Sequence, residues 1–117
     1  HFASAIELLR EAGNRPMEAV MLGNLGHAAM DLGELDEAHD ALLAAIEVHQ
    51  ETGNQRAEGH FLAVLADVHL RRNEVDRGLE RLGQAKALLE RSGDTVKLAA
   101  ALALEAKLLE ASVGSAR

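Results

Sequence analysis

The sequence predicts an all-α fold, an α-solenoid built from antiparallel helix pairs, and three observations support this prediction. A turn-forming stretch recurs every 40 residues, at positions 11–14, 51–54 and 91–94. Recurrence at a fixed spacing in this range is characteristic of repeat architectures. The apolar residues, 48% of the chain, include no Trp, no Tyr and only two Phe, which suits close helix packing better than a β-sandwich. A single proline, Pro16, leaves nearly the whole chain free to form long helices.

Composition and charge narrow the classes of protein and partner. The 117 residues correspond to one domain, and 19 acidic against 12 basic residues argue against nucleic acid as a partner. The absence of Cys excludes disulfides and thiolate metal sites, and it fits a reducing compartment. The uncharged run of residues 98–104, like every other uncharged run in the sequence, is too short to cross a membrane. No signal-peptide pattern opens the sequence, so we expect a cytoplasmic protein with no membrane partner.

Turn signals divide each 40-residue unit into two helices. The expected helices cover residues 15–32, 35–52, 55–72, 75–92 and 95–112, and residues 2–12 match the end of the second helix of a unit. Apolar residues at three- and four-residue steps, such as Leu22, Leu25 and Ala29, support these helices. The expected single repeat domain, 1–117, comprises a partial unit 1–13, full units 14–53 and 54–93, a half unit 94–112 and a tail 113–117.

The expected helix ends carry residues with known capping preferences. Asn14, Asn54 and Asp94 are favourable N-caps, and a glycine immediately precedes each of them. The weaker stop between the two helices of a unit holds Gly33 in the first full unit and Asn73 in the second. Gly and Asn both tolerate the left-handed conformation found just after a helix C-terminus, which explains their exchange at one repeat position.

Several glycines fall inside the expected helices, where each costs about 1 kcal/mol relative to Ala. They are Gly23, Gly26, Gly59, Gly78 and Gly83. Their presence predicts close approach of another helix backbone. Gly26 aligns with Ala66 and Ala106 in the later units. We therefore expect Gly26→Ala to be neutral or mildly stabilising and Gly26→Leu to overpack.

The repeat resembles the tetratricopeptide-repeat (TPR) family. In the first full unit the residues in the family's order are Leu22, Leu25, Gly26 and Ala29, followed by Ala38, Leu42 and Ala45. The second unit follows this order more loosely, with Leu62, Leu65 and Ala66. The 40-residue period, longer than the usual 34 or so, is similar to the sensor arrays of MalT-like bacterial regulators and to the longer repeats of kinesin light chains and polarity adaptors. The resemblance implies a right-handed superhelix acting as a protein-interaction scaffold.

The resemblance also implies that the first helices of the units line a concave, partner-binding groove. The candidate groove residues are Asn24, His27, Met30, Asp31, His60, Asp67, Arg71, Lys107 and Glu110, above a small-residue floor of Gly23, Ala63 and Ala103. His27, Asp67 and Lys107 occupy one equivalent position in three units and predict a row of mixed charge. A simple solvated helix face is the alternative. The basic clamp that some members use for a C-terminal carboxylate is missing, which implies a different ligand or none.

No catalytic, cofactor or metal site is expected. His60 and His69 should point to opposite faces of one helix, and Asp36, His39 and Asp40 are typical of a solvated acidic surface. No Ser or Thr has the strand–turn–helix context of a nucleophile elbow. The stretch 23–26 resembles a Gly-rich loop, but it lies within a helix and lacks the Lys-Ser or Lys-Thr of a phosphate-binding loop.

The sequence therefore predicts a non-catalytic protein–protein interaction module, a fragment of a larger regulatory or signalling protein. One alternative is a regulatory array that senses a peptide or small effector. Another is a homo-oligomerisation scaffold. Glu105 would give the last helix a partly polar capping surface, yet residues 98–104 are uncharged on every side. We therefore expect weak self-association, as a homodimer, through the C-terminal helix.

Overall fold

The computed structural model describes residues 2–116, and the side chains of residues 6–114. Its six helices are α1 (Phe2–Glu11), α2 (Arg15–Asp31), α3 (Leu35–Thr52), α4 (Gln55–Arg71), α5 (Val75–Ser92) and α6 (Thr95–Ala116). No strand occurs within the described range. The all-α prediction is confirmed, and the expected helix bounds are correct to within one residue except at the end of α6. That helix continues through the expected tail as far as Ala116.

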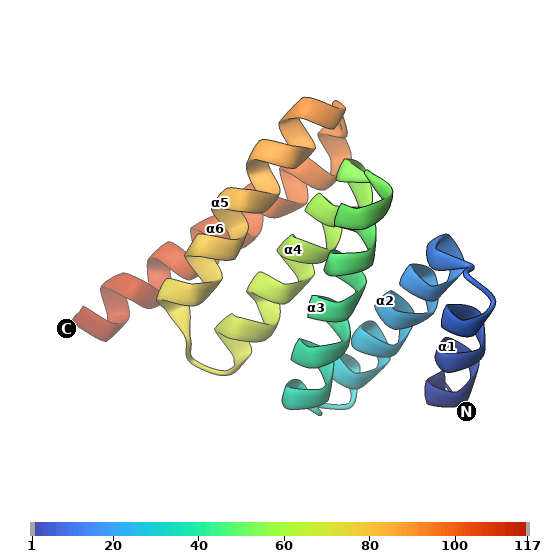
Figure 1. Ribbon diagram of the computed structural model, residues 1–117. Helices are drawn as coiled ribbons and strands as arrows, with labels where there is room; N and C mark the ends of the chain where they lie inside the picture. The colour runs from blue at the N-terminus through green and yellow to red at the C-terminus, as the bar shows by residue number, and fades with distance from the viewer. Residues whose placement is uncertain (1, 117) are drawn as a thin grey trace.

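Successive helices run antiparallel and pack against one another in chain order (Figure 1). In addition, α2 contacts α4, and α4 contacts α6. The first helices of the units thus lie side by side, whereas α3 and α5 pack on them without contacting each other. The molecule measures 51 × 31 × 18 Å, with α1 and α6 at opposite ends (Figure 1). None of the described helices is long and apolar enough to cross a membrane.

The turns have the conformations that the capping residues predict. The glycines after α1, α2, α3 and α5 all have positive φ, between 71° and 77°, and Asn73 after α4 has a φ of 61°. The side chains of Asn14, Asn54 and Asp94 each accept a hydrogen bond from the backbone N–H three residues later, at 3.4, 3.2 and 3.1 Å. These bonds satisfy donors at the helix N-termini that would otherwise lack partners. The predicted caps and the Gly–Asn exchange are therefore confirmed.

The core consists mainly of Leu and Ala from the facing sides of neighbouring helices. Leu42, Leu65, Leu82, Leu89 and Leu108 are fully buried. One charged side chain, that of Glu18, is also fully buried. Its carboxylate pairs with Arg10 of α1 at 3.0 Å and, within α2, with Arg15 at 2.7 Å. The Arg10 ion pair therefore joins the first two helices in addition to their apolar packing.

The interior glycines are close to neighbouring side chains more often than to a neighbouring backbone. A Cβ added at Gly26 would lie 2.7 Å from Cγ of the buried Leu42. Gly78 is the position at which backbone approaches most closely, with the Ala66 carbonyl oxygen 3.2 Å from such a Cβ. The prediction of close packing is wrong for Gly83, where a Cβ would meet no atom within 4 Å. Helical spacing explains this, because Gly83 lies on the exposed side of α5.

Candidate functional site

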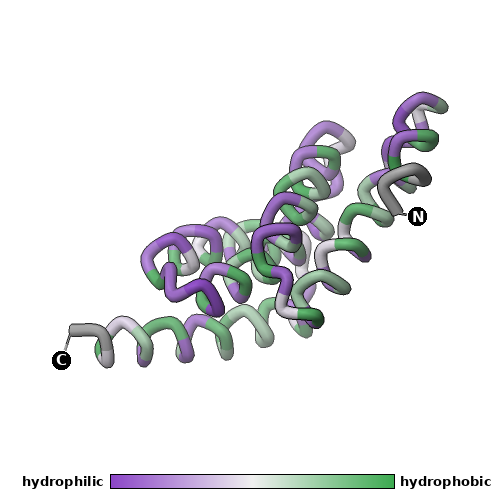
Figure 2. Tube along the Cα trace, turned by 90° about the horizontal axis from the view of Figure 1, so that it is seen from below, coloured by the Kyte–Doolittle hydropathy of each residue, from purple (hydrophilic) through white to green (hydrophobic). Residues whose placement is uncertain are grey.

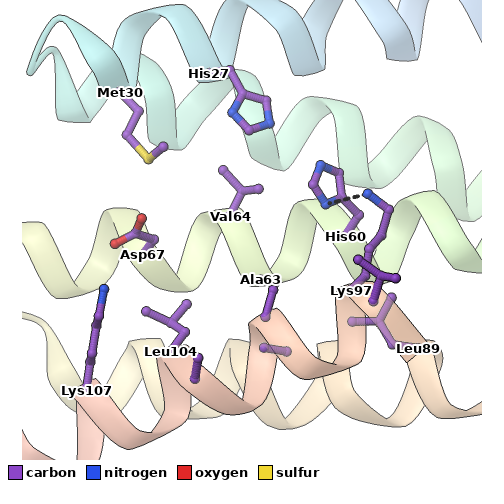
Figure 3. A pocket seen from close by; sticks show the side chains of 14 residues that line it. His27, Met30, His60, Ala63, Val64, Asp67, Leu89, Lys97, Leu104 and Lys107 are labelled. Carbon is purple, nitrogen blue, oxygen red and sulfur yellow. Dashed lines mark hydrogen bonds between the residues drawn. The ribbon is translucent and has the colours of Figure 1, made fainter. Parts of the chain in front are cut away.

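A cavity of about 550 Å³ lies across α2, α4 and α6 (Figure 3). We call it the three-helix pocket. Its polar lining residues are His27, His60, Asp67, Lys97 and Lys107. Its apolar lining residues include Met30 of α2, Val64 of α4 and Leu104 of α6, together with small residues of α4 and α6. The contacts of α4 with both α2 and α6 hold these three helices side by side.

The structure brings together seven of the residues expected to form a groove. They are His27, Met30, His60, Ala63, Asp67, Ala103 and Lys107. His27, Asp67 and Lys107 each come from a different helix, as their shared repeat position predicts. Figure 3 shows Lys107 extending from α6 toward Asp67 of α4, at the opposite end of the pocket from His60.

The remaining expected residues do not line this pocket. Gly23 is buried beneath the ring of Phe61, because a Cβ there would lie 2.4 Å from Cζ of that ring. The expected three-residue floor is thus reduced to Ala63 and Ala103. The repeat spacing could not show this, since the ring that covers Gly23 comes from the neighbouring helix α4.

The other four expected groove residues are polar and lie outside the pocket lining. Asn24 and Asp31 are exposed on α2, outside the pocket lining. Arg71 is exposed near the end of α4, where its Nε lies 3.6 Å from Oδ1 of Asp67. Glu110 borders a separate hollow formed entirely by residues of α6.

Lys97 is a pocket residue that the repeat comparison missed. Its Nζ lies 3.4 Å from Nδ1 of His60, joining the first turn of α6 to α4 (Figure 3). The signal that could have found it is helical spacing, because positions 97, 100, 104 and 107 follow three- and four-residue steps along one face. The equivalent residues of α2 and α4 are Met17 and Ala57, so comparison between units gave no indication of a charge here.

Aromatic rings form a continuous cluster at the Lys97 end of the pocket. His27 and His60 stack with ring centroids 5.8 Å apart, and Phe61 lies 4.9 Å from His60. His49 stacks on Phe61 at 5.5 Å with nearly parallel planes. Burial is the main cause that lowers the pKa of His60 to about 4, with the charges of Lys97 and His27 acting in the same direction. His60 is therefore neutral at neutral pH.

The charge of the pocket differs in sign from that of the whole chain. Two Lys and one Asp line it, whereas the chain carries a net charge of −7. Asp67 is already paired with Arg71. Neither Lys97 nor Lys107 is ion-paired with a carboxylate among the side chains of residues 6–114. The arrangement offers two ammonium groups to an anionic ligand above an apolar surface.

Metal-binding geometry is not found in the described part of the chain, which contains no group of three His, Cys, Asp or Glu placed to hold an ion. Asp36 lies 3.8 Å from Arg72, while His39 contacts Asp40 at 3.1 Å. His69 is buried on the other side of α4 from the pocket, where its Nδ1 contacts Glu74 at 3.0 Å. The two histidines of α4 thus do point to different surroundings. None of the pocket-lining residues carries a hydroxyl or thiol.

Comparison with protein-family models gave no match, and comparison with curated proteins found no relative.

Proposed function

We propose that the chain is a non-catalytic, TPR-like interaction module that binds a segment of a partner protein in the three-helix pocket. The observation that carries the proposal is the position of this pocket across α2, α4 and α6. In a right-handed solenoid of TPR type, the first helices of successive units line the concave surface. The three helices that line the pocket are the first helices of the expected units. A regulatory or signalling protein of the cytoplasm is the setting we propose for such a module.

The lining favours a segment that combines apolar side chains with an acidic one. Met30, Val64 and Leu104 provide the apolar surface. At one end, Lys97 lies beside a neutral imidazole, so its positive charge is available to a carboxylate. Lys107 offers a second ammonium about two to three turns further along α6. Charge complementarity of this kind contributes mainly to specificity and association rate, while the apolar contacts contribute most of the affinity.

A small effector is the second candidate, and the size of the pocket favours it. A volume of about 550 Å³ lies within the range of roughly 300–1,000 Å³ typical of small-molecule sites. A sensor of this kind would close on its ligand and change shape, whereas a scaffold would hold a peptide with little rearrangement. Small-angle scattering with and without a bound ligand separates the two functions.

Peptide display against the immobilised chain tests the proposed function. We expect selected peptides to contain an acidic residue flanked by apolar ones, and Lys97→Ala with Lys107→Ala to weaken them roughly tenfold, about 1.4 kcal/mol. Arg77→Ala with Arg91→Ala provides a matched control, because both are exposed cations of α5 outside the pocket lining. Undiminished binding to the double variant, or equal loss in the control, would place recognition on another surface.

A further inference from the structure

Hydrogen-bond donors from three helices meet at one end of the three-helix pocket. His27 belongs to α2, His60 to α4 and Lys97 to α6. The two rings have centroids 5.8 Å apart, and Nζ of Lys97 lies 3.4 Å from Nδ1 of His60. Figure 3 shows both rings pointing into the space between α2 and α4, with Lys97 reaching His60 from the side of α6. We call these three residues the donor cluster.

The contact with Lys97 determines which nitrogen of His60 can donate to a ligand. An ammonium group only donates, so Nδ1 accepts, and the neutral ring carries its proton on Nε2. Among the side chains of residues 6–114, the buried atoms without a hydrogen-bond partner are Nε2 of His49 and Nε2 of His69. Nε2 of His60 has no partner in this range either, and it is not buried, so its N–H is free to bind a ligand. Lys97 keeps two further N–H groups.

Neighbouring charges favour an anion at the donor cluster over the other end of the pocket. The carboxylate of Asp94 accepts hydrogen bonds from Nε of Arg56 at 2.7 Å and from the backbone N–H of Lys97 at 3.1 Å, so it is occupied at the start of α6. At the other end, Lys107 extends toward the carboxylate of Asp67 (Figure 3). An anion that approaches Lys107 therefore meets a like charge within the pocket, whereas one that approaches Lys97 meets imidazole rings.

The donor cluster suits an anion and not a metal ion. A ring nitrogen binds a metal through a lone pair, but the lone pair of His60 accepts from Lys97 and its other nitrogen carries a proton. His27 offers at least one ring N–H in either protonation state. The two oxygens of a carboxylate can accept from several of these donors at once. Beyond Lys97, α6 is hydrophobic over residues 98–104 (Figure 2), so the surface beside the donor cluster is apolar.

We propose that the donor cluster binds one carboxylate side chain, from an Asp or Glu, of the partner segment. This inference rests on the proposed function and adds the position and direction of the bound segment. Its acidic residue lies on the donor cluster, and its apolar residues follow α6 toward Lys107. One carboxylate oxygen accepts from Lys97 and the other from Nε2–H of His60, while His27 donates from the side of α2. Lys97 is thus a counter-charge for the ligand and also a positioning residue for His60.

Two tripeptides that are blocked at both ends, acetyl-Leu-Glu-Leu-amide and acetyl-Leu-Gln-Leu-amide, test the subsite because they differ in the charge of one side chain. In NMR titrations of the unaltered chain, the Glu tripeptide should shift the ring signals of His27 and His60, and the Gln tripeptide should bind about tenfold more weakly. Lys97→Met should bring the two tripeptides to similar affinity. It should also release His60 to both neutral tautomers, which the ring nitrogen chemical shifts distinguish. Arg91→Met is the control, an exposed cation of α5 outside the pocket lining.

Two substitutions test the part played by His60. A Gln side chain can accept from Lys97 and donate from its amide, as the imidazole does, so His60→Gln should retain the preference for the Glu tripeptide. His60→Phe keeps a ring without a donor, so it should weaken the Glu tripeptide severalfold and affect the Gln tripeptide less. Circular dichroism checks that both variants are folded, and Lys97→Met tests the subsite even where one of them is not.

The subsite is wrong if the Glu tripeptide leaves both rings unmoved, if the two tripeptides bind equally, or if the preference for Glu survives Lys97→Met. Inorganic phosphate that shifts the same signals more strongly than the Glu tripeptide would assign the donor cluster to a phosphate group instead. Either failure leaves the proposed function standing, because a longer segment can still bind the apolar lining and Lys107. A confirmed subsite, together with display-selected peptides that bind elsewhere, would contradict the proposed function alone.

Discussion

The ammonium of Lys97 lies 3.4 Å from Nδ1 of His60 and joins α6 to α4 at one end of the three-helix pocket. An ammonium group can only donate, so Nδ1 is the acceptor and the ring carries its proton on Nε2. The low pKa of His60, about 4, agrees with this neutral state. The contact orients Lys97 without neutralising it, because a neutral imidazole supplies no opposing charge.

We expect the protein to lose stability as the pH falls from about 6.5 toward 4. The unfolded chain takes up a proton at His60 near pH 6.5, whereas the folded protein does so only near pH 4. The unfolded state thus binds more protons between these values, so stability rises with pH across the window. His49 and His69, whose pKa values are also lowered by burial, act in the same direction. Thermal denaturation from pH 7 to 4 measures the effect.

His60→Gln isolates the contribution of His60. The variant should show a shallower decline of Tm with falling pH, and the part that remains should come from His49 and His69. An unchanged pH slope in His60→Gln would show that His60 titrates in the folded protein much as it does in the unfolded chain.

Two glycines with the same helix propensity are expected to respond oppositely to alanine. At Gly83 a methyl group meets no neighbour, so Gly83→Ala should stabilise the protein by about 1 kcal/mol. At Gly26 a methyl group would press on the buried Leu42 at 2.7 Å. Overpacking of this kind costs roughly 1–3 kcal/mol, which outweighs the helical gain. The alignment of Gly26 with Ala66 suggests that Gly26→Ala is neutral or mildly stabilising, but the contact with Leu42 makes us expect a loss of stability instead.

Urea denaturation of the two variants checks this contrast. The expected difference between them is on the order of 2 kcal/mol, with Gly83→Ala above the parent protein and Gly26→Ala below it. Equal free energies of unfolding for the two variants would mean that Leu42 moves aside without cost.

Because the carboxylate of Glu18 is buried, removing its two arginine partners is expected to destabilise the protein more than removing the carboxylate itself. Removing Arg10 and Arg15 together would leave Glu18 buried without a counter-charge, and such losses cost about 3–5 kcal/mol. Glu18→Gln removes the buried charge and leaves two arginines that are partly exposed and can be hydrated. We expect it to cost only about 1 kcal/mol. A larger loss for Glu18→Gln than for the double arginine variant would contradict this account of the α1–α2 junction.

The helices and their ends could be predicted because they depend on local sequence. The N-cap side chains of Asn14, Asn54 and Asp94 and the left-handed residues after the helices act within a few residues of themselves. Helix α6 continues to Ala116 because no Gly-Asn or Gly-Asp turn follows residue 112. The expected end at residue 112 only repeated the helix ends expected at residues 32 and 72 of the earlier units.

The pocket depends on side chains from different helices, and there the repeat spacing predicted only part of the result. It placed His27, Asp67 and Lys107 together because they share one repeat position. It could not show that Phe61 covers Gly23, since no other unit has an aromatic residue at that position. It likewise missed Lys97, because the contact with His60 joins two helices at positions that are not equivalent.

The row formed by Asp67 and Lys107 is expected to matter for binding and little for folding. Asp67 is only half-buried and is paired with the exposed Arg71, while Lys107 is exposed and lines the pocket from α6. Exposed ion pairs contribute about 0–1 kcal/mol, so replacing both residues by Ala should leave Tm nearly unchanged. Peptides selected on the unaltered chain should bind the double variant more weakly, because it lacks the lysine at this end of the pocket. Asp31→Ala with Arg91→Ala is a charge-matched control of two exposed residues outside the pocket lining. If the double Asp67 and Lys107 variant unfolds, these residues are structural. If it binds the peptides as tightly as the control does, this end of the pocket takes no part in recognition.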